Sequence, residues 1–151
     1  PVLVGVDGSP GGEAALGFAF AEASLRGAPL VALHTWNNWT GPVSGGPDEP
    51  LPLVYDVDML RDEEERVLVE ALSGWQAEYP DVTVHRRLVQ GRARPALIEA
   101  SGSAQLLVVG ARGRGGFSGL LLGSVSQAVL QHAHCPVAVV RNLGERRDGR
   151  R

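Results

Sequence analysis

The sequence predicts an α/β fold, an open and doubly wound sheet of five parallel strands with helices on both faces. Three observations predict it. Short, continuous apolar runs recur along the chain, as is typical of strands that are buried on both faces. Segments with apolar residues at helical spacing separate these runs. Because each helix connects two strands, the strands form parallel βαβ units.

The expected elements alternate regularly from one end of the chain to the other. Strands are predicted at residues 2–6, 30–36, 82–89, 106–110 and 136–141, and helices at residues 10–26, 55–79, 94–101 and 124–132. Ser9 and Pro10 suit the start of the first helix, and Gly27 suits its end. The charged run at residues 62–66 is assigned to the solvated face of the second helix. Residues 37–53 are rich in Gly and Pro and predict a long loop.

Length and composition predict one ordinary globular domain. The chain has 151 residues, of which we expect residues 1–143 to form the domain and residues 144–151 a disordered polar tail. The net charge is −3 and the arginines are scattered, which is not the pattern of a nucleic-acid-binding surface. No apolar run approaches the roughly 20 residues needed to cross a bilayer. We therefore expect a cytoplasmic protein with no nucleic-acid or membrane partner. The chain begins at Pro1, which leaves open that it is trimmed or part of a longer protein.

Two features of composition exclude classes of site. All 14 basic residues are arginine, and a P-loop NTPase or a Schiff-base enzyme would need a lysine. His132, His134 and Cys135 lie close in sequence, but they span the end of a helix and the start of a strand. We therefore favour packing roles for them and expect no metal site. No motif for an exposed nucleophile or a Ser-His-Asp triad is present, so the sequence suggests no catalytic residue.

A glycine-rich loop after the fourth strand is the main candidate site. It begins at Gly110 and Gly113, directly after a buried strand, and ends at Gly123 and Ser124, directly before a helix. Such a backbone can approach a polyanion closely, and the helix adds unpaired N–H groups and the positive end of its dipole. The loop therefore favours phosphate binding over a role as a flexible connector. The dinucleotide pattern G-x-G-x-x-G is not met, because Ser118 stands where its third glycine belongs.

Each of the other candidate residues has both a ligand-binding and a purely structural interpretation. Asp7 follows the first strand, where it can accept hydrogen bonds from ribose hydroxyls or simply stabilise a turn. A carboxylate is a poor neighbour for phosphate unless a cation lies between them. Ser124 and Gln127 match a capping box, which is compatible with anion binding at the same helix end. Arg112 and Arg114 can pair with phosphates or remain solvated. If the first and fourth strands are neighbours, Asp7 and the glycine loop face one crevice.

At these residues the chain resembles the universal stress protein family. The family's signature is Gly-x2-Gly-x9-Gly-(Ser/Thr), matched by Gly110, Gly113, Gly123 and Ser124. The opening Val-Gly-Val-Asp-Gly-Ser and the closing His-Cys-Pro-Val-Ala-Val-Val also resemble the first and last strands of that family, so the resemblance spans residues 2–141. The chain is similar above all to one domain of the tandem stress proteins of actinobacteria.

The resemblance implies a fold and a ligand. The family's sheet has the strand order 3-2-1-4-5, in an adenine nucleotide α-hydrolase-like fold, which makes the first and fourth strands neighbours. Members with the full motif bind ATP, which we expect here with or without Mg²⁺. Asp7 would hold the ribose, the backbone at Thr35 the adenine, and Gly5 would let the nucleotide approach the first strand. The ribose and phosphates would contact Gly110, Ala111, Arg112, Gly113, Arg114, Gly115, Gly116, Gly123, Ser124 and Val125.

The resemblance also implies a partner. Members commonly dimerise through the last strand, which predicts pairing of Val137, Ala138, Val139 and Val140 with a second copy or a sister domain. We therefore predict an ATP-binding regulatory or stress-response domain, with no catalysis beyond weak ATP hydrolysis. The alternatives are a slow ATPase or nucleotide-transferring enzyme on the same crevice, and a dimeric interaction module without a ligand.

Overall fold

A computed structural model of the chain describes residues 1–37, 57–112 and 122–142. Its elements follow the predicted alternation of strands and helices. They are β1 (Val2–Gly5), the 3-10 turn η1 (Pro10–Gly12), α1 (Glu13–Arg26), β2 (Leu30–Trp36), α2 (Val57–Glu78), β3 (Val84–Gln90), α3 (Ala93–Ser101), β4 (Leu106–Gly110), α4 (Ser124–His132) and β5 (Val137–Val140). The loop predicted at residues 37–53, apart from Asn37, and the tail at residues 144–151 lie outside the described residues.

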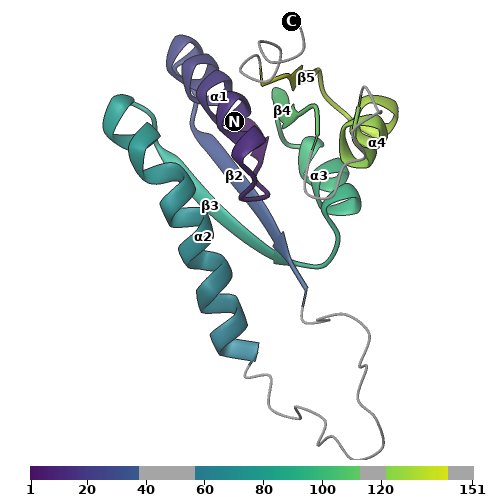
Figure 1. The fold of residues 1–151 in the computed structure, drawn as a ribbon. Coiled ribbons are helices and arrows are strands. Elements are labelled where there is room, and N and C mark those ends of the chain that lie inside the picture. The colour runs from purple at the N-terminus through teal and green to yellow at the C-terminus, as the bar shows by residue number, and fades with distance from the viewer. Residues whose placement is uncertain (38–56, 113–121, 143–151) are drawn as a thin grey trace, which may run out of the picture.

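The strands form one sheet in the order β3-β2-β1-β4-β5. All four pairs of neighbouring strands are parallel, with Val2 opposite Leu30 of β2 on one side and Leu106 of β4 on the other. The order implied by the family resemblance is therefore confirmed. It places β1 in the centre, makes β1 and β4 neighbours, and leaves β3 and β5 at the two edges (Figure 1).

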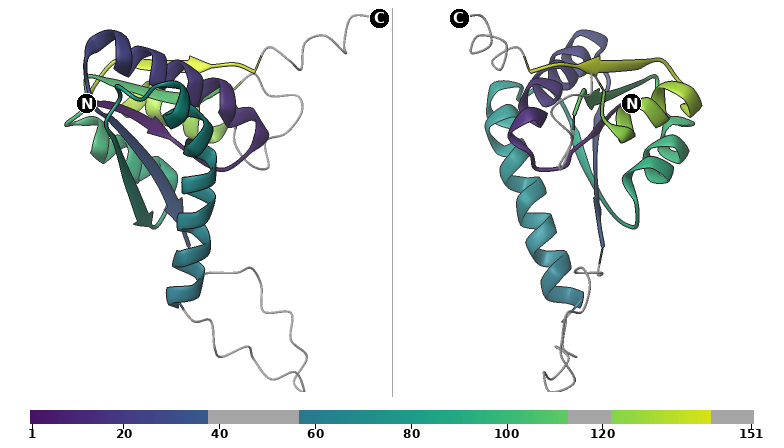
Figure 2. Two further views of the ribbon diagram at one scale, coloured as in Figure 1. Left: turned by 90° about the vertical axis from the view of Figure 1, so that its left-hand side faces the viewer. Right: turned by 45° about the vertical axis from the view of Figure 1, so that its right-hand side comes forward.

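Helices cover both faces of the sheet, as predicted. In the views of Figures 1 and 2, α1 and α2 lie on one face and α3 and α4 on the other. Alternate residues of β1 divide between the two layers, since Val2 and Val4 pack with α1 and α2 while Leu3 packs with α3 and α4. β1 is thus apolar on both faces, which explains why it reads as a continuous apolar run.

Local signals set both ends of the first helical segment. Gly27 follows α1 with a φ of 59°, and its N–H bonds to the carbonyls of Ala23 and Ser24. Pro10 opens the first helical segment as a 3-10 turn before α1 begins at Glu13. β3 begins at Val84, two residues later than predicted, although Val82 is already buried against the core. Among the described residues, no helix has the length and apolar character that crossing a membrane requires.

Candidate functional site

The carboxyl ends of β1 and β4 lie side by side. The segment after β1 runs through Asp7 into η1, and the segment after β4 begins at Gly110. A Cβ atom built on Gly110 would lie 3.8 Å from the carbonyl oxygen of Gly11, which shows how closely the two segments approach. The two predicted halves of the site are the Asp7 turn and the start of the glycine loop. They are therefore neighbours at the carboxyl ends of the strands.

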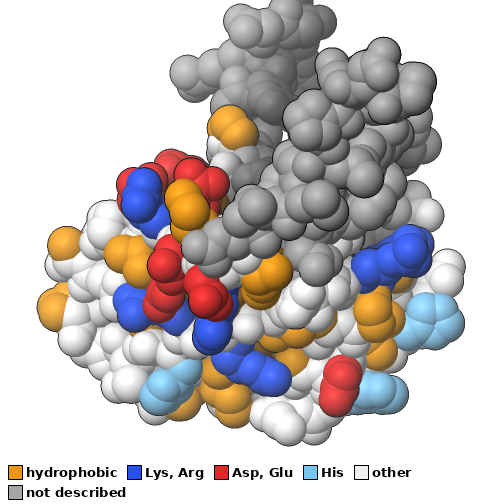
Figure 3. Space-filling view, turned by 90° about the horizontal axis from the view of Figure 1, so that it is seen from below, with side chains coloured by type: hydrophobic (Ala, Val, Ile, Leu, Met, Phe, Trp, Pro, Cys, Tyr) orange, Lys and Arg blue, Asp and Glu red, His pale blue; other side chains and the backbone are white. Residues whose placement is uncertain are grey.

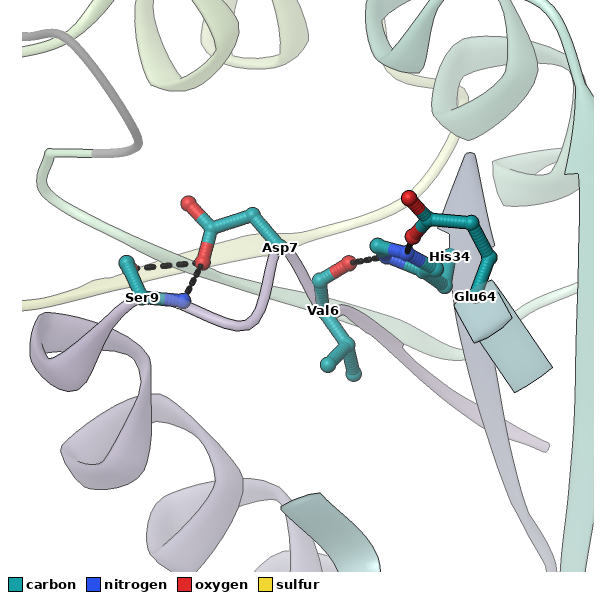
Figure 4. A network of polar contacts seen from close by, with 5 residues as sticks. All are labelled: Val6, Asp7, Ser9, His34 and Glu64. Atoms are coloured by element: carbon teal, nitrogen blue, oxygen red, sulfur yellow. Dashed lines mark hydrogen bonds and ion pairs between the residues drawn. The ribbon is translucent and has the colours of Figure 1, made fainter. Parts of the chain in front are cut away.

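The Asp7 carboxylate organises its own turn. Its Oδ1 accepts hydrogen bonds from the backbone N–H of Ser9 at 2.8 Å and from the Ser9 hydroxyl at 2.6 Å (Figure 4). This is the hydrogen-bond pattern of an Asx-turn. Asp7 therefore stabilises a turn, which was the structural alternative to a role in ribose binding. The other oxygen, Oδ2, makes no hydrogen bond or ion pair with the described residues and points away from Ser9 (Figure 4). One oxygen holds the turn, and the second remains free to accept a hydrogen bond from a ligand.

The base of the glycine loop is closed by hydrogen bonds between its two ends. The N–H of Gly123 donates to the carbonyl of Ala111 at 2.6 Å. The buried Ser126 hydroxyl lies 3.1 Å from the same carbonyl and 2.9 Å from that of Gly123. The end of β4 and the start of α4 are thereby held together. Ser126 was not among the predicted residues, although a serine one turn into an apolar helix face is a signal for such a bond.

The predicted capping box at Ser124 and Gln127 is wrong. α4 begins at Ser124 itself, the N-cap position is taken by Gly123, and no side chain caps this helix. The Gln127 amide instead donates to the carbonyl of Leu122 at 3.1 Å. The box fails because Ser124 is the first residue of the helix and not its N-cap, a shift of one position that local spacing does not reveal. The exposed Ser124 hydroxyl makes no hydrogen bond with the described residues.

The remaining predicted residues divide between described and undescribed parts of the chain. Arg112 is exposed, and Val125 packs partly against the core on the α3 and α4 side. Thr35 lies at the carboxyl end of β2, opposite Val89 of β3. The predicted residues that lie outside the described part are Gly113, Arg114, Gly115 and Gly116.

Gly5 has a packing role that the sequence did not reveal. A Cβ atom at Gly5 would lie 3.1 Å from Cδ1 of Leu97 in α3 and 3.6 Å from Cγ1 of Val109 in β4. The absence of a side chain at Gly5 therefore allows α3 to pack closely against β1. This role exists whether or not a ligand approaches the first strand.

A buried histidine beside the site was also missed. His34 of β2 is 3% exposed. Its Nδ1 lies 2.6 Å from the carbonyl oxygen of Val6, and its Nε2 lies 2.5 Å from Oε2 of Glu64 in α2 (Figure 4). The assignment of residues 62–66 to the solvated face is therefore wrong for Glu64, which reaches into the protein. The signal was present in the helical spacing, because Glu64 lies four residues before the buried Leu68.

A groove elsewhere on the surface is not part of this site. It runs between α2 and β3, and none of the described site residues lines it. Its charged lining residues are Arg61, Glu65, His85, Arg86 and Arg87. Arginine and acidic side chains lie intermixed on the described part of the face in Figure 3. Charged side chains on an edge strand such as β3 discourage pairing with other chains, which accounts for Arg86 and Arg87.

Neither histidines nor the single cysteine form a metal site in the described residues. No group of three His, Cys, Asp or Glu side chains there is placed to hold a metal ion. Cys135 is partly buried, and burial raises the pKa of its thiol above the ordinary range, opposed by a backbone hydrogen bond at Leu107.

Comparison with known proteins decides the family. The family model described as "Universal stress protein family" matches residues 1–141. The chain belongs to the universal stress protein family. It is 49% identical over 141 residues to a universal stress protein of Mycobacterium tuberculosis, covering 93% of this chain and 44% of that protein. It is 50% identical over 146 residues to one of Mycolicibacterium smegmatis, covering 93% and 45%. This universal stress protein chain thus spans less than half the length of these relatives.

Solved structures agree with the fold. Universal stress protein UspA from Lactobacillus plantarum superposes with a TM-score of 0.69 at 21% identity, covering 93% of this chain and 96% of that one. A universal stress protein crystallised in complex with cAMP superposes with a TM-score of 0.66 at 28% identity, covering 93% and 95%. The five-stranded parallel sheet of this universal stress protein is therefore the fold of its family.

Proposed function

We propose that this universal stress protein domain binds ATP between the Asp7 turn and the glycine loop, and that nucleotide occupancy regulates its interactions. The observation that carries the proposal is the approach of Gly110 to Gly11. It brings the backbone after β4 against the turn whose carboxylate has a free oxygen. A nucleotide in this crevice would meet a carboxylate on one side and a side-chain-poor loop on the other.

Each part of the crevice suits one part of the nucleotide. The free Oδ2 of Asp7 can accept hydrogen bonds from ribose hydroxyls. The N-terminus of α4 offers unpaired N–H groups and the positive end of its dipole to phosphate, next to the exposed Ser124 hydroxyl. Backbone groups at Thr35 are proposed to contact adenine. The relative that forms a complex with cAMP supports an adenine nucleotide as the class of ligand.

Isothermal titration tests this proposal. The purified chain is titrated with ATP in the presence and absence of Mg²⁺, and then with AMP and cAMP as competitors for the same crevice. We expect a single site that ATP occupies, since the glycine motif is complete and α4 can bind additional phosphates. No heat of binding at millimolar nucleotide would overturn the proposal. Mass spectrometry of the freshly purified protein reports any nucleotide that copurifies.

The enzymatic alternative is distinguished by product formation. Oδ1 of Asp7 accepts two hydrogen bonds from Ser9, and Oδ2 is proposed to accept from the ribose, so neither oxygen is left to act as a general base. Release of ADP that disappears in Asp7→Ala, while ATP still binds, would favour a slow ATPase. ATP binding without turnover supports the regulatory role.

The proposal includes pairing through β5. This strand is one edge of the sheet, and its four residues are all partly exposed, so its outer side can pair with a second β5. The partner is a second copy of the chain or a sister domain. The second possibility follows from the length of the relatives, of which this chain covers 44–45%.

A further inference from the structure

We infer that His34 and Glu64 position the Asp7 turn for the nucleotide and connect the proposed site to α2. This inference rests on the proposed function, because it concerns the affinity of that same crevice. His34 acts through the backbone of Val6 and is a positioning residue, with no contact to the ligand required. Glu64 holds His34 in place from a different layer of the fold.

Both backbone groups of Val6 are held by consecutive residues of β2. The N–H of Val6 donates to the carbonyl of Leu33 at 2.9 Å, and its carbonyl accepts from Nδ1 of His34 at 2.6 Å. The strand β1 itself ends at Gly5, so this pair of bonds holds the first residue beyond the strand. Asp7 follows directly, and its orientation depends on where the Val6 peptide is held. Loss of the His34 contact would free the residue from which the turn departs.

The geometry requires a single proton between His34 and Glu64. A carbonyl oxygen only accepts, so Nδ1 of His34 must carry a hydrogen toward Val6. Nε2 lies 2.5 Å from a carboxylate oxygen of Glu64. Either the ring is a cation bonded to an ionised Glu64, or a neutral ring accepts from a protonated Glu64. Without that proton, a nitrogen lone pair would face a carboxylate oxygen at hydrogen-bond distance, and the contact would be repulsive.

No other described charged group shares this contact. Asp7, at the end of β1, turns its carboxylate toward Ser9 and away from the imidazole (Figure 4). On the β3 side, the residue opposite His34 is the apolar Leu88. On α2, Arg61 and Glu65 line the groove against β3. Glu64 is therefore the charged partner of the imidazole among the described residues.

The arrangement predicts that nucleotide affinity depends on the partner of Nε2. Glu64→Gln keeps such a partner, because a glutamine amide can donate to the Nε2 of a neutral ring. Glu64→Ala leaves Nε2 without a partner. We expect it to weaken ATP binding roughly 3- to 10-fold, the scale of couplings that act through a network without ligand contact.

The test compares ATP affinity for the wild-type chain, Glu64→Gln, Glu64→Ala and Glu63→Gln. Glu63 is the matched control, since it is an exposed neighbour on the same helix with the same change in charge. We expect Glu63→Gln to bind ATP like the wild-type chain, and Glu64→Gln to retain most of the affinity that Glu64→Ala loses. Unchanged affinity in Glu64→Ala, or an equal loss in Glu64→Gln and Glu64→Ala, would overturn the inference.

A measurement without nucleotide separates this inference from the proposed function. Hydrogen exchange in the free protein reports the amides of Val6, bonded to Leu33, and of Ser9, bonded to Asp7. We expect faster exchange at both amides in Glu64→Ala and unchanged exchange in Glu63→Gln. If the wild-type chain bound no nucleotide but Glu64→Ala showed this change, the proposed function would fail and the positioning of the turn would stand. Unchanged exchange at both amides contradicts the positioning itself.

Discussion

Asp7 and Ser9 are joined by two hydrogen bonds that meet at a single carboxylate oxygen. The donors are the backbone N–H and the hydroxyl of Ser9, at 2.8 and 2.6 Å from Oδ1. Because Oδ1 is engaged and Oδ2 is free within the described residues, the structural role of Asp7 and its proposed role in ligand binding fall on different atoms. The two roles can therefore be tested separately.

Asp7→Asn is expected to preserve the turn and weaken nucleotide binding. The asparagine carbonyl can still accept from Ser9, but its amide NH₂ replaces the oxygen that would accept from ribose. We expect an unchanged melting temperature and ATP binding weakened about 10- to 100-fold, the scale of a lost hydrogen bond to a charged group. The measurement is isothermal titration beside thermal unfolding. As the control, Ser9→Ala removes the hydroxyl contact but not the ligand acceptor and should bind ATP nearly as well as the wild-type chain.

A larger side chain at position 110 is expected to block the crevice without unfolding the protein. A Cβ atom there would lie 3.5 Å from the Arg112 carbonyl oxygen and 3.8 Å from that of Gly11, which are ordinary contact distances. Gly110→Leu should therefore fold, as judged by circular dichroism, while its side chain fills the space proposed for the nucleotide. Titration should show no ATP binding. Wild-type affinity in Gly110→Leu would place the nucleotide elsewhere.

Val139→Pro is expected to break pairing through β5 and leave the sheet intact. The carbonyls of Pro136 and Val140 accept hydrogen bonds from the N–H groups of Leu107 and Ala111, on the side of β4. Successive residues of a strand direct their backbone groups to opposite sides, so the N–H of Val139 points outward. Proline removes that donor at an edge, where it is tolerated. Light scattering should report a monomer where the wild-type chain is a dimer. A monomeric wild-type chain would instead favour a sister domain as the partner.

A matched pair of glycine substitutions tests the packing of α1 on α2. A Cβ atom at Gly17 would lie 2.7 Å from Cη2 of Trp75, whose ring stacks on Phe20, so Gly17→Ala must displace the indole. We expect a loss of about 1–3 kcal/mol in the free energy of unfolding. Gly74→Ala, in α2, meets no atom within 4 Å and should gain about 0.5–1 kcal/mol from helix propensity. Urea denaturation measures both changes, and equal effects would contradict the role of Gly17.

The Cys135 thiol is expected to react slowly at neutral pH. Burial raises its pKa, so less thiolate is present in the folded protein than in an exposed cysteine. Alkylation by iodoacetamide should be slower than for glutathione at pH 8 and should still rise with pH above about 9. In urea the rate should match that of glutathione. Because the folded state holds the thiol proton more tightly, this group lowers stability as the pH rises past its ordinary pKa.

The ends of the elements were predictable where their cause is local. Gly27 ends α1 because its left-handed backbone suits glycine, and Pro10 begins the segment because its φ suits the first helical position. The predictions failed where a partner is distant in sequence. The bond from Gly123 to Ala111 joins the two ends of the glycine loop, and Glu64 leaves the solvated face to bond His34, 30 residues away.

The sequence by itself determined the alternation of strands and helices, the glycine loop between β4 and α4, and the family that these features resemble. These features follow from spacing along the chain, which local backbone preferences and apolar periodicity record directly. Only the tertiary structure decided which oxygen of Asp7 is free, which residue caps α4, and that His34 joins Val6 to Glu64. Each of these depends on how close in space two segments lie, and that proximity arises only when the sheet and its helices have packed together.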